Sequence, residues 1–158
     1  MHPDVKMIQQ AIHAVLSPLG FKKNRAVWIR VLPEVRQVVA LDRGTWGSRC
    51  WFDFGVNVRK VNDDPKPRFY QLHLRWSDSQ LMPEKERLAW IDIKDLDDPV
   101  MSPEERAEKF ADVAHRYILP TLALVDSVKM IKKYLANPPR GNMAPGMSME
   151  LRQNLHLL

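Results

Sequence analysis

The sequence is poor in cysteine and lacks long apolar runs, and each shortage excludes a class of protein. Cys50 is the single cysteine among 158 residues, so no internal disulfide can form and we expect a reducing compartment such as the cytoplasm. No segment reaches the ~20 apolar residues that a membrane-spanning helix needs. The first residues also lack the basic and then apolar pattern of a secretory signal. We therefore predict a cytoplasmic globular protein with no membrane segment.

Basic residues exceed acidic ones by only five, and the excess is unevenly distributed. The net charge is +6 over residues 1–61, −5 over residues 62–113 and +4 over residues 114–158. Nucleic-acid binding needs cations gathered on one face, where they can contact successive phosphates. An acidic middle between basic ends does not supply such a stripe, so a nucleic-acid-binding module is the last of three functional hypotheses.

Apolar residues at three- and four-residue steps predict a first helix over residues 4–16 or 4–19, ended by Gly20. Alternation then predicts strands at residues 26–32, 35–42, 50–61 and 69–77. Residues 88–93 fit either a fifth short strand or a helical turn. Ser102 and Glu105 form a capping-box pattern that starts another helix, which Pro120 should break or kink. A further helix is predicted to begin at Asp126 or Ser127.

Consecutive strands between helices predict an α+β fold. We expect an antiparallel meander sheet of four or five strands, with the N-terminal helix and the C-terminal helices packed on one face. Phe52, Phe54, Val56 and Val58 lie on one side of the third strand and mostly polar residues on the other, so the sheet should be covered on one side only. Residues 1–136 are predicted to form one α+β domain, and residues 137–158 a Pro/Gly-containing tail with a short terminal helix.

Several short motifs resemble a known bacterial family. They are the Leu-Gly-Phe-Lys-Lys run at residues 19–23, the pair Trp28 and Arg30, the Phe-Asp-Phe-Gly-Val run at residues 52–56, and later blocks at residues 86–88 and 117–120. Together they resemble the domain-of-unknown-function family catalogued as number 4304, over about residues 2–136. The resemblance implies an α+β domain with no established activity, cofactor or catalytic residue. Some members resemble cargo of secreted-toxin loci, which suggests an immunity-type role.

No catalytic or metal-binding constellation stands out in the sequence. The five histidines show no metal-ligand spacing. Cys50 has no neighbouring pattern that marks a base, and the aspartates at residues 92–98 lack the glycine and the closing glutamate of a calcium loop. We therefore expect no metal, no cofactor and no catalytic residue, and we lean toward a protein that is not an enzyme.

A surface rich in tryptophan and arginine is the main candidate site. The residues are Arg43, Trp46, Arg49 and Trp51 at the entry of the third strand, followed on the expected polar face by Asp53, His73 and Arg75. Tryptophan and arginine are enriched in protein-binding hot spots, and Asp53 with Arg75 could form a cross-strand pair. The competing interpretation is that Trp46 and Trp51 pack into the core or under the tail.

The leading hypothesis is a non-catalytic protein-binding domain, of the kind that neutralises a toxin-like protein partner. The alternative is a small enzyme or ligand-binding protein with a pocket between sheet and helices, in which His73 and Asp53 would act as an acid–base pair. The sequence does not decide whether the chain forms a homodimer.

Overall fold

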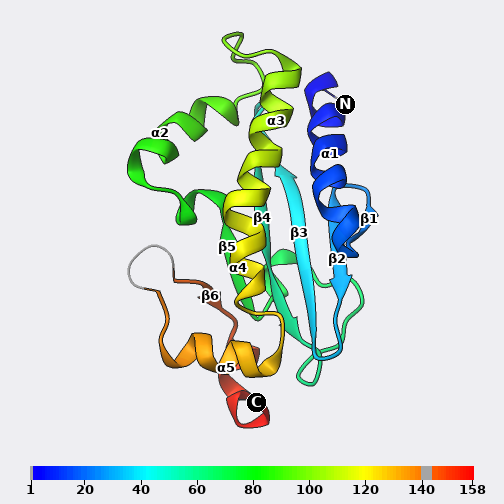
Figure 1. The fold of residues 1–158 in the computed structure, drawn as a ribbon, viewed down its shortest axis with the longest axis vertical. Helices are drawn as coiled ribbons and strands as arrows, with labels where there is room; N and C mark the ends of the chain where they lie inside the picture. Colours follow the sequence, from blue (N-terminus) through cyan, green and yellow to red (C-terminus); the bar gives the residue numbers. More distant parts are fainter. Residues whose placement is uncertain (1, 140–143) are drawn as a thin grey trace.

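The computed structural model, which describes residues 2–139 and 144–158, has an N-terminal helix, an antiparallel sheet and C-terminal helices (Figure 1). This confirms the predicted α+β fold, with six strands in place of four or five. The strands lie in chain order: β1 (Lys22–Asn24), β2 (Val27–Val31), β3 (Val35–Arg43), β4 (Cys50–Val58), β5 (Leu74–Ser77) and β6 (Gly146–Met147). The helices are α1 (Pro3–Leu16), α2 (Glu84–Ile93), α3 (Pro103–Val113), α4 (Leu119–Ala123), α5 (Val128–Ala136) and α6 (Met149–Gln153).

The strands that alternation missed are short and carry no apolar pattern. β1 is three exposed residues, and β6 is two residues in a segment rich in proline and glycine. The segment predicted as a strand over residues 69–77 begins instead with a 3-10 turn at Phe69–Gln71, and only residues 74–77 pair with β4. Residues 88–93, which fitted either a strand or a helical turn, lie in α2.

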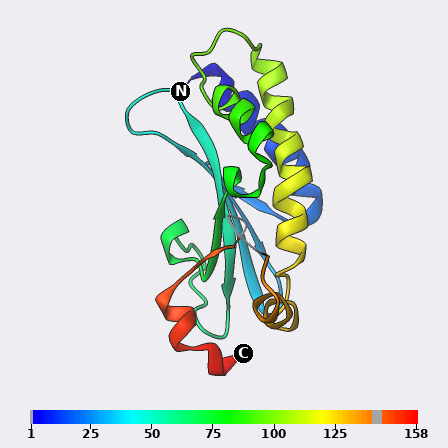
Figure 2. The ribbon, with the colours of Figure 1, turned by 90° about the vertical axis from the view of Figure 1, so that its left-hand side faces the viewer.

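Helices α1 and α3 lie side by side on one face of the sheet, as Figure 2 shows along the edge of the strands. The apolar row of β4 points at them. Phe52 packs against Phe110 of α3 with ring centroids 5.5 Å apart. Trp90 of α2 also packs against Phe110, with ring centroids 4.7 Å apart. Burial of each such aromatic side chain stabilises the fold by about 2 to 3 kcal/mol. The N-terminus of α3 carries the predicted capping box between Ser102 and Glu105.

The helix that was expected to stop or kink near Pro120 continues instead through a π-helical segment, Ala114–Ile118, into α4. Proline occupies an early position in α4, where its fixed φ suits a helical turn. The wider π turn absorbs the change in hydrogen-bond register. The two helices therefore form one nearly continuous rod across the sheet (Figure 1).

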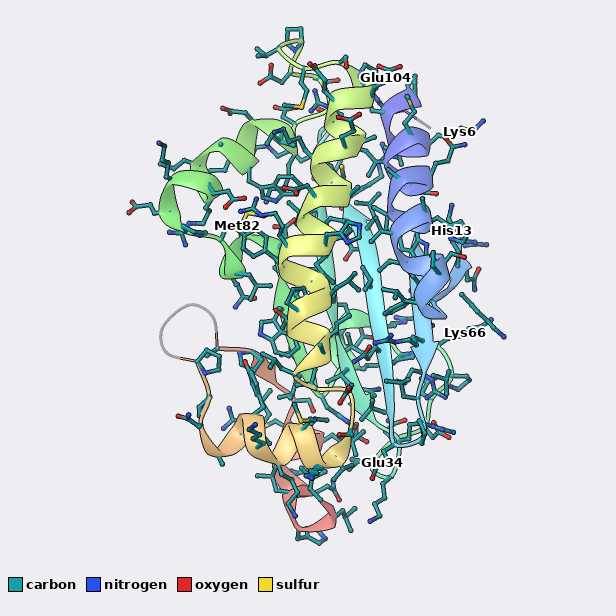
Figure 3. The ribbon with its side chains drawn as sticks, in the orientation of Figure 1. Lys6, His13, Glu34, Lys66, Met82 and Glu104 are labelled. Carbon is teal, nitrogen blue, oxygen red and sulfur yellow. The ribbon has the colours of Figure 1, made fainter. Side chains whose placement is uncertain are left out.

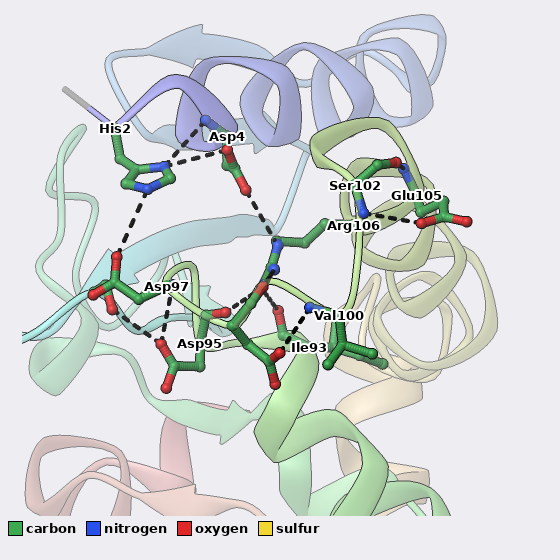
Figure 4. Close-up of polar contacts among 11 residues, drawn as sticks. His2, Asp4, Ile93, Asp95, Asp97, Val100, Ser102, Glu105 and Arg106 are labelled. Atoms are coloured by element: carbon green, nitrogen blue, oxygen red, sulfur yellow. Dashed lines mark hydrogen bonds and ion pairs between the residues drawn. The ribbon is translucent and has the colours of Figure 1, made fainter.

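A buried arginine joins the helices at the end of the molecule shown in Figure 4. Arg106 of α3 is 1% exposed and forms an ion pair with Asp4 of α1 at 3.3 Å. Its guanidinium also donates to the carbonyl oxygens of Ile93, Asp95 and Asp98 in the connection between α2 and α3. These partners compensate for the cost of burying the charge.

The face opposite α1 and α3 is not open along its whole length, so the expectation of a sheet covered on one side only is wrong there. Residues 59–73 fold back across it, and Figure 3 shows Lys66 of this segment at the β2 side of the molecule. Arg36 of β3 forms an ion pair with Asp63 at 2.8 Å. Asp53 and Asn57 of β4 are buried although they lie on the polar side. Polar alternation therefore did not predict exposure, because hydrogen-bonding segments cover this part of the sheet.

Residues 144–158 add to the same face. β6 pairs antiparallel with β5, and the amide of Ser148 donates to the carbonyl oxygen of His73 at 3.0 Å. Leu151 of α6 is fully buried and joins the main core. The C-terminal segment therefore extends the sheet and covers one end of it, on the side away from α1 (Figure 2).

Candidate functional site

A cleft of about 580 Å³ lies on the second face, between the sheet and residues 66–69 of the segment that folds back across it. Its apolar lining comes from β2 and β3, through Val27, Ile29, Val38 and Ala40. Residues 66–69 form one wall, and Asn24 at the end of β1 and Arg25 in the turn that follows also contribute. The cleft therefore lies on the opposite side of the sheet from the pocket between sheet and helices that the sequence suggested.

Two carboxyl groups lie together in this cleft. β3 and β4 pair so that Ala40 faces Asp53 and Asp42 faces Trp51. Asp42 and Asp53 are therefore diagonal neighbours on one face of the sheet, and their side chains are hydrogen bonded to each other. Burial, this hydrogen bond and the nearby charge of Asp53 raise the pKa of Asp42 to about 7. Near neutral pH the Asp42 carboxyl is therefore in equilibrium between its protonated and ionised forms.

Two neutral donors hold Asp53 in place. The indole Nε1 of Trp51 donates to Oδ2 at 2.9 Å, and the hydroxyl of Ser77 donates to Oδ1 at 2.6 Å. Trp51 reaches it because residues two apart on a strand share a face, and Ser77 stands directly opposite Asp53 on β5. Both oxygens of Asp53 therefore accept a hydrogen bond from an uncharged donor.

The hairpin that joins β3 to β4 carries most of the predicted tryptophan–arginine surface. Trp46 is 94% exposed, and Arg43 and Arg49 are also exposed. The interpretation that Trp46 packs into the core is therefore wrong, whereas Trp51 is half-buried with its indole on Asp53. The hairpin follows directly after Asp42, which lines the cleft, but Arg43 pairs with Cys50 and points to the opposite face of the sheet from Asp42.

The structure does not bring His73 and Arg75 into that site. Arg75 faces Gly55 rather than Asp53, and its guanidinium donates to the carbonyl oxygen of Tyr70 at 3.2 Å. The expected Asp53–Arg75 cross-strand pair is therefore wrong. His73 is fully buried below the C-terminal segment, where its Nδ1 accepts from the amide of Val58 at 2.8 Å. It contacts no carboxyl group of the cleft, so the proposed His73–Asp53 acid–base pair is not formed.

Asp42 and the wall at residues 66–69 were missed in the sequence. Asp42 ends an apolar strand and has no acidic neighbour in the chain, because its partner comes from the next strand. Only the register between β3 and β4 brings Asp42 and Asp53 together. The single signal available was the position of Asp42, two residues after Ala40 and on the same side of the strand.

The described residues hold no group of three or more histidine, cysteine, aspartate or glutamate side chains that could bind a metal ion. Cys50 is buried, and burial raises the pKa of its thiol to about 12, far above that of a nucleophilic cysteine. The chemistry that this arrangement offers is therefore the binding of a cation or a hydrogen-bond donor by the two carboxyl groups.

Comparison with known proteins places the chain in a family without assigning it a role. Across the part of the chain that the structure describes, no helix is both long and apolar enough to cross a membrane. No curated protein and no solved structure matches the chain. Residues 12–124 match the family described as a domain of unknown function, DUF4304. That match spans more than half of the sequence, so the chain belongs to the DUF4304 family.

Proposed function

We propose that this protein is a non-catalytic binding domain of the bacterial cytoplasm, which holds a toxin-like protein partner against the cleft and the adjoining hairpin. The observations that carry the proposal are an open cleft with an apolar lining and a tryptophan, Trp46, that is 94% exposed on the hairpin that follows the cleft residue Asp42. Exposed aromatic side chains next to a cleft are typical anchors of protein interfaces. Arg43 and Arg49 flank this tryptophan and can pair with acidic groups of a partner.

The cleft also supports a second candidate, a small-molecule site. Its volume of about 580 Å³ lies in the range of ligand pockets, and Asp42 with a pKa near 7 is suited to exchange a proton with a bound molecule. Nucleic-acid binding is the least favoured, because the net charge changes sign along the chain, from +6 to −5 to +4, and does not supply a basic stripe.

The test is to purify the protein with the product of the gene that neighbours its own, and to measure binding by calorimetry and protection of growth on co-expression. Trp46→Ala should weaken binding at least about tenfold. Leu88→Ala is the matched control, since Leu88 is an exposed apolar residue on α2, away from the cleft. Absence of binding at micromolar concentration, together with unprotected growth, would count against the proposal.

A further inference from the structure

We propose that the contact between His73 and Glu150 makes the docking of the C-terminal segment, residues 144–158, sensitive to pH. This segment lies on the sheet at neutral pH and detaches in mild acid, while β3 and β4 remain paired. The inference goes beyond the proposed binding role, because it concerns the edge of the sheet at β5 and β6 and uses no residue that lines the cleft.

The C-terminal segment is held on the sheet by a short strand and by the burial of Leu151. β6 is two residues long, whereas β3 and β4 are nine residues each. The amide of Ser148 donates to the carbonyl oxygen of His73 at 3.0 Å, and Leu151 is fully buried. Detachment of this segment leaves the pairing of β3 with β4 unbroken, so it requires less free energy than unfolding of the whole domain.

His73 lies under this segment in a site that fits only its neutral form. Its side chain is fully buried. The Nδ1 atom accepts a hydrogen bond from the amide of Val58 at 2.8 Å, and the Nε2 atom lies 3.1 Å from a carboxylate oxygen of Glu150. A proton added at Nδ1 would place two N–H groups against each other. Protonation of His73 therefore opposes the docked arrangement.

The charged groups around this contact come from three elements. Among residues 2–139 and 144–158, Glu150 of α6 is the ionisable group that contacts the ring of His73. Arg75 of β5 donates instead to the carbonyl oxygen of Tyr70 at 3.2 Å. Lys60, which follows β4, donates to a carbonyl oxygen of the final 3-10 turn at 3.4 Å. Glu150 is therefore the charge that favours the protonated ring, and burial opposes it.

The docked and detached states differ in their affinity for a proton. Burial lowers the pKa of His73 in the docked state, and Glu150 only partly offsets this effect. Water reaches the ring once the segment has left, so the pKa returns toward the ordinary value near 6.5. The detached state therefore binds the proton more tightly, and detachment becomes more frequent as the pH falls below about 6.5.

Detachment has a structural consequence at β5. Leu74 and Arg75 pair with β6 in the docked state, so the edge of β5 loses this partner when the segment leaves. An unpaired strand edge can accept another extended segment. Mild acid therefore opens a strand-binding edge that is covered at neutral pH.

The experiment is hydrogen exchange of the full chain, measured by NMR at pH 7.5 and pH 5.5 and corrected for the intrinsic exchange rate. The amide of Ser148 is the reporter, because it donates directly to His73. Its protection should fall about tenfold between the two pH values, the ratio expected when a histidine with a pKa near 6.5 takes up its proton only in the detached state. At both pH values this amide should also be at least about tenfold less protected than the most slowly exchanging amides of β3 and β4.

Two histidine variants separate this contact from a general effect of acid. His73→Gln can keep a donor toward Glu150 and an acceptor toward Val58 but does not titrate, so the pH dependence of Ser148 protection should disappear. His115→Gln removes an exposed histidine of the π-helical segment and should retain the tenfold fall. Three results would each overturn the inference: a change of less than about twofold at Ser148 in the wild type, protection at Ser148 equal to that of β3 and β4, or the same fall in His73→Gln as in the wild type.

Discussion

His73 Nε2 lies 3.1 Å from Glu150 Oε2, and this contact joins the C-terminal segment to the residue that directly precedes β5. The Nδ1 atom of the same ring accepts a hydrogen bond from the amide of Val58. The proton of the neutral imidazole must therefore sit on Nε2 and point at Glu150. A histidine in this position cannot take up a second proton without opposing the amide of Val58.

Acidification should therefore weaken the fold through His73. Burial, only partly offset by Glu150, lowers the pKa of His73 in the folded protein. The contribution of His73 to folding stability is therefore complete above the pKa of histidine in the unfolded chain, near 6.5, and is lost as the pH falls below that pKa. Between pH 7.5 and 5.5 the wild type should lose about 1 kcal/mol more unfolding free energy than His73→Gln. Urea denaturation at both pH values measures this, and equal losses in the two proteins would contradict it.

Asp42 should make the unfolding free energy depend on pH in the opposite direction to His73. Its folded pKa of about 7 is above that of an unfolded aspartate, so its contribution is complete below about pH 4 and is lost as the pH rises through 7. Relative to Asp42→Asn, the wild type should lose about 1 to 2 kcal/mol between pH 5 and pH 8, a value reduced because water screens this half-exposed group. Denaturation of both proteins tests this, with Glu104→Gln as a control whose pH dependence matches the wild type.

Cys50 should be inert in the folded protein. Its side chain is fully buried, and desolvation raises the pKa of the thiol to about 12, so almost no thiolate exists at pH 8. A thiol-specific colorimetric reagent should detect no free thiol in native protein and one per chain in urea. Fast reaction without denaturant would show that the start of β4 opens readily.

Gly55 should tolerate no side chain. A β-carbon at this position would lie against the carbonyl oxygen of Leu74 and 3.0 Å from the Leu72 side chain. Backbone cannot move aside within a paired sheet, so Gly55→Ala should cost more than about 3 kcal/mol of unfolding free energy. Gly44→Ala is the matched control: its nearest new contact would be 3.7 Å, and it should change stability by less than about 1 kcal/mol. Similar losses in both variants would contradict this explanation.

The apolar side of the fold was predictable from the sequence because hydrophobic spacing reports it directly. The Phe52 row and the Ser102 capping box both lie as expected. These features depend on residues close together in the chain. The position of Trp46 on an exposed hairpin was one of two alternatives that the sequence left open.

The candidate site was not predictable because it depends on register and on returning segments. Asp42 and Asp53 meet only when β3 and β4 pair in one particular alignment. Asn57 and His73 appeared to belong to a solvent-facing side, yet both are buried, since residues 59–73 and the C-terminal segment supply covering contacts. The alternation of polar and apolar residues along a strand shows which face is polar. That face is exposed to solvent only where no other segment packs over the strand.

The buried guanidinium of Arg106 has a consequence for how the far end of the molecule unfolds. One side chain holds the first turn of α1 through Asp4 and the link to α2 through three carbonyl oxygens. If any one of these segments detached alone, a charge would remain inside the protein without its full set of partners. The amide protons of these two segments and of the start of α3, which carries Arg106, should therefore exchange with deuterium together, as one cooperative unit with a common opening free energy.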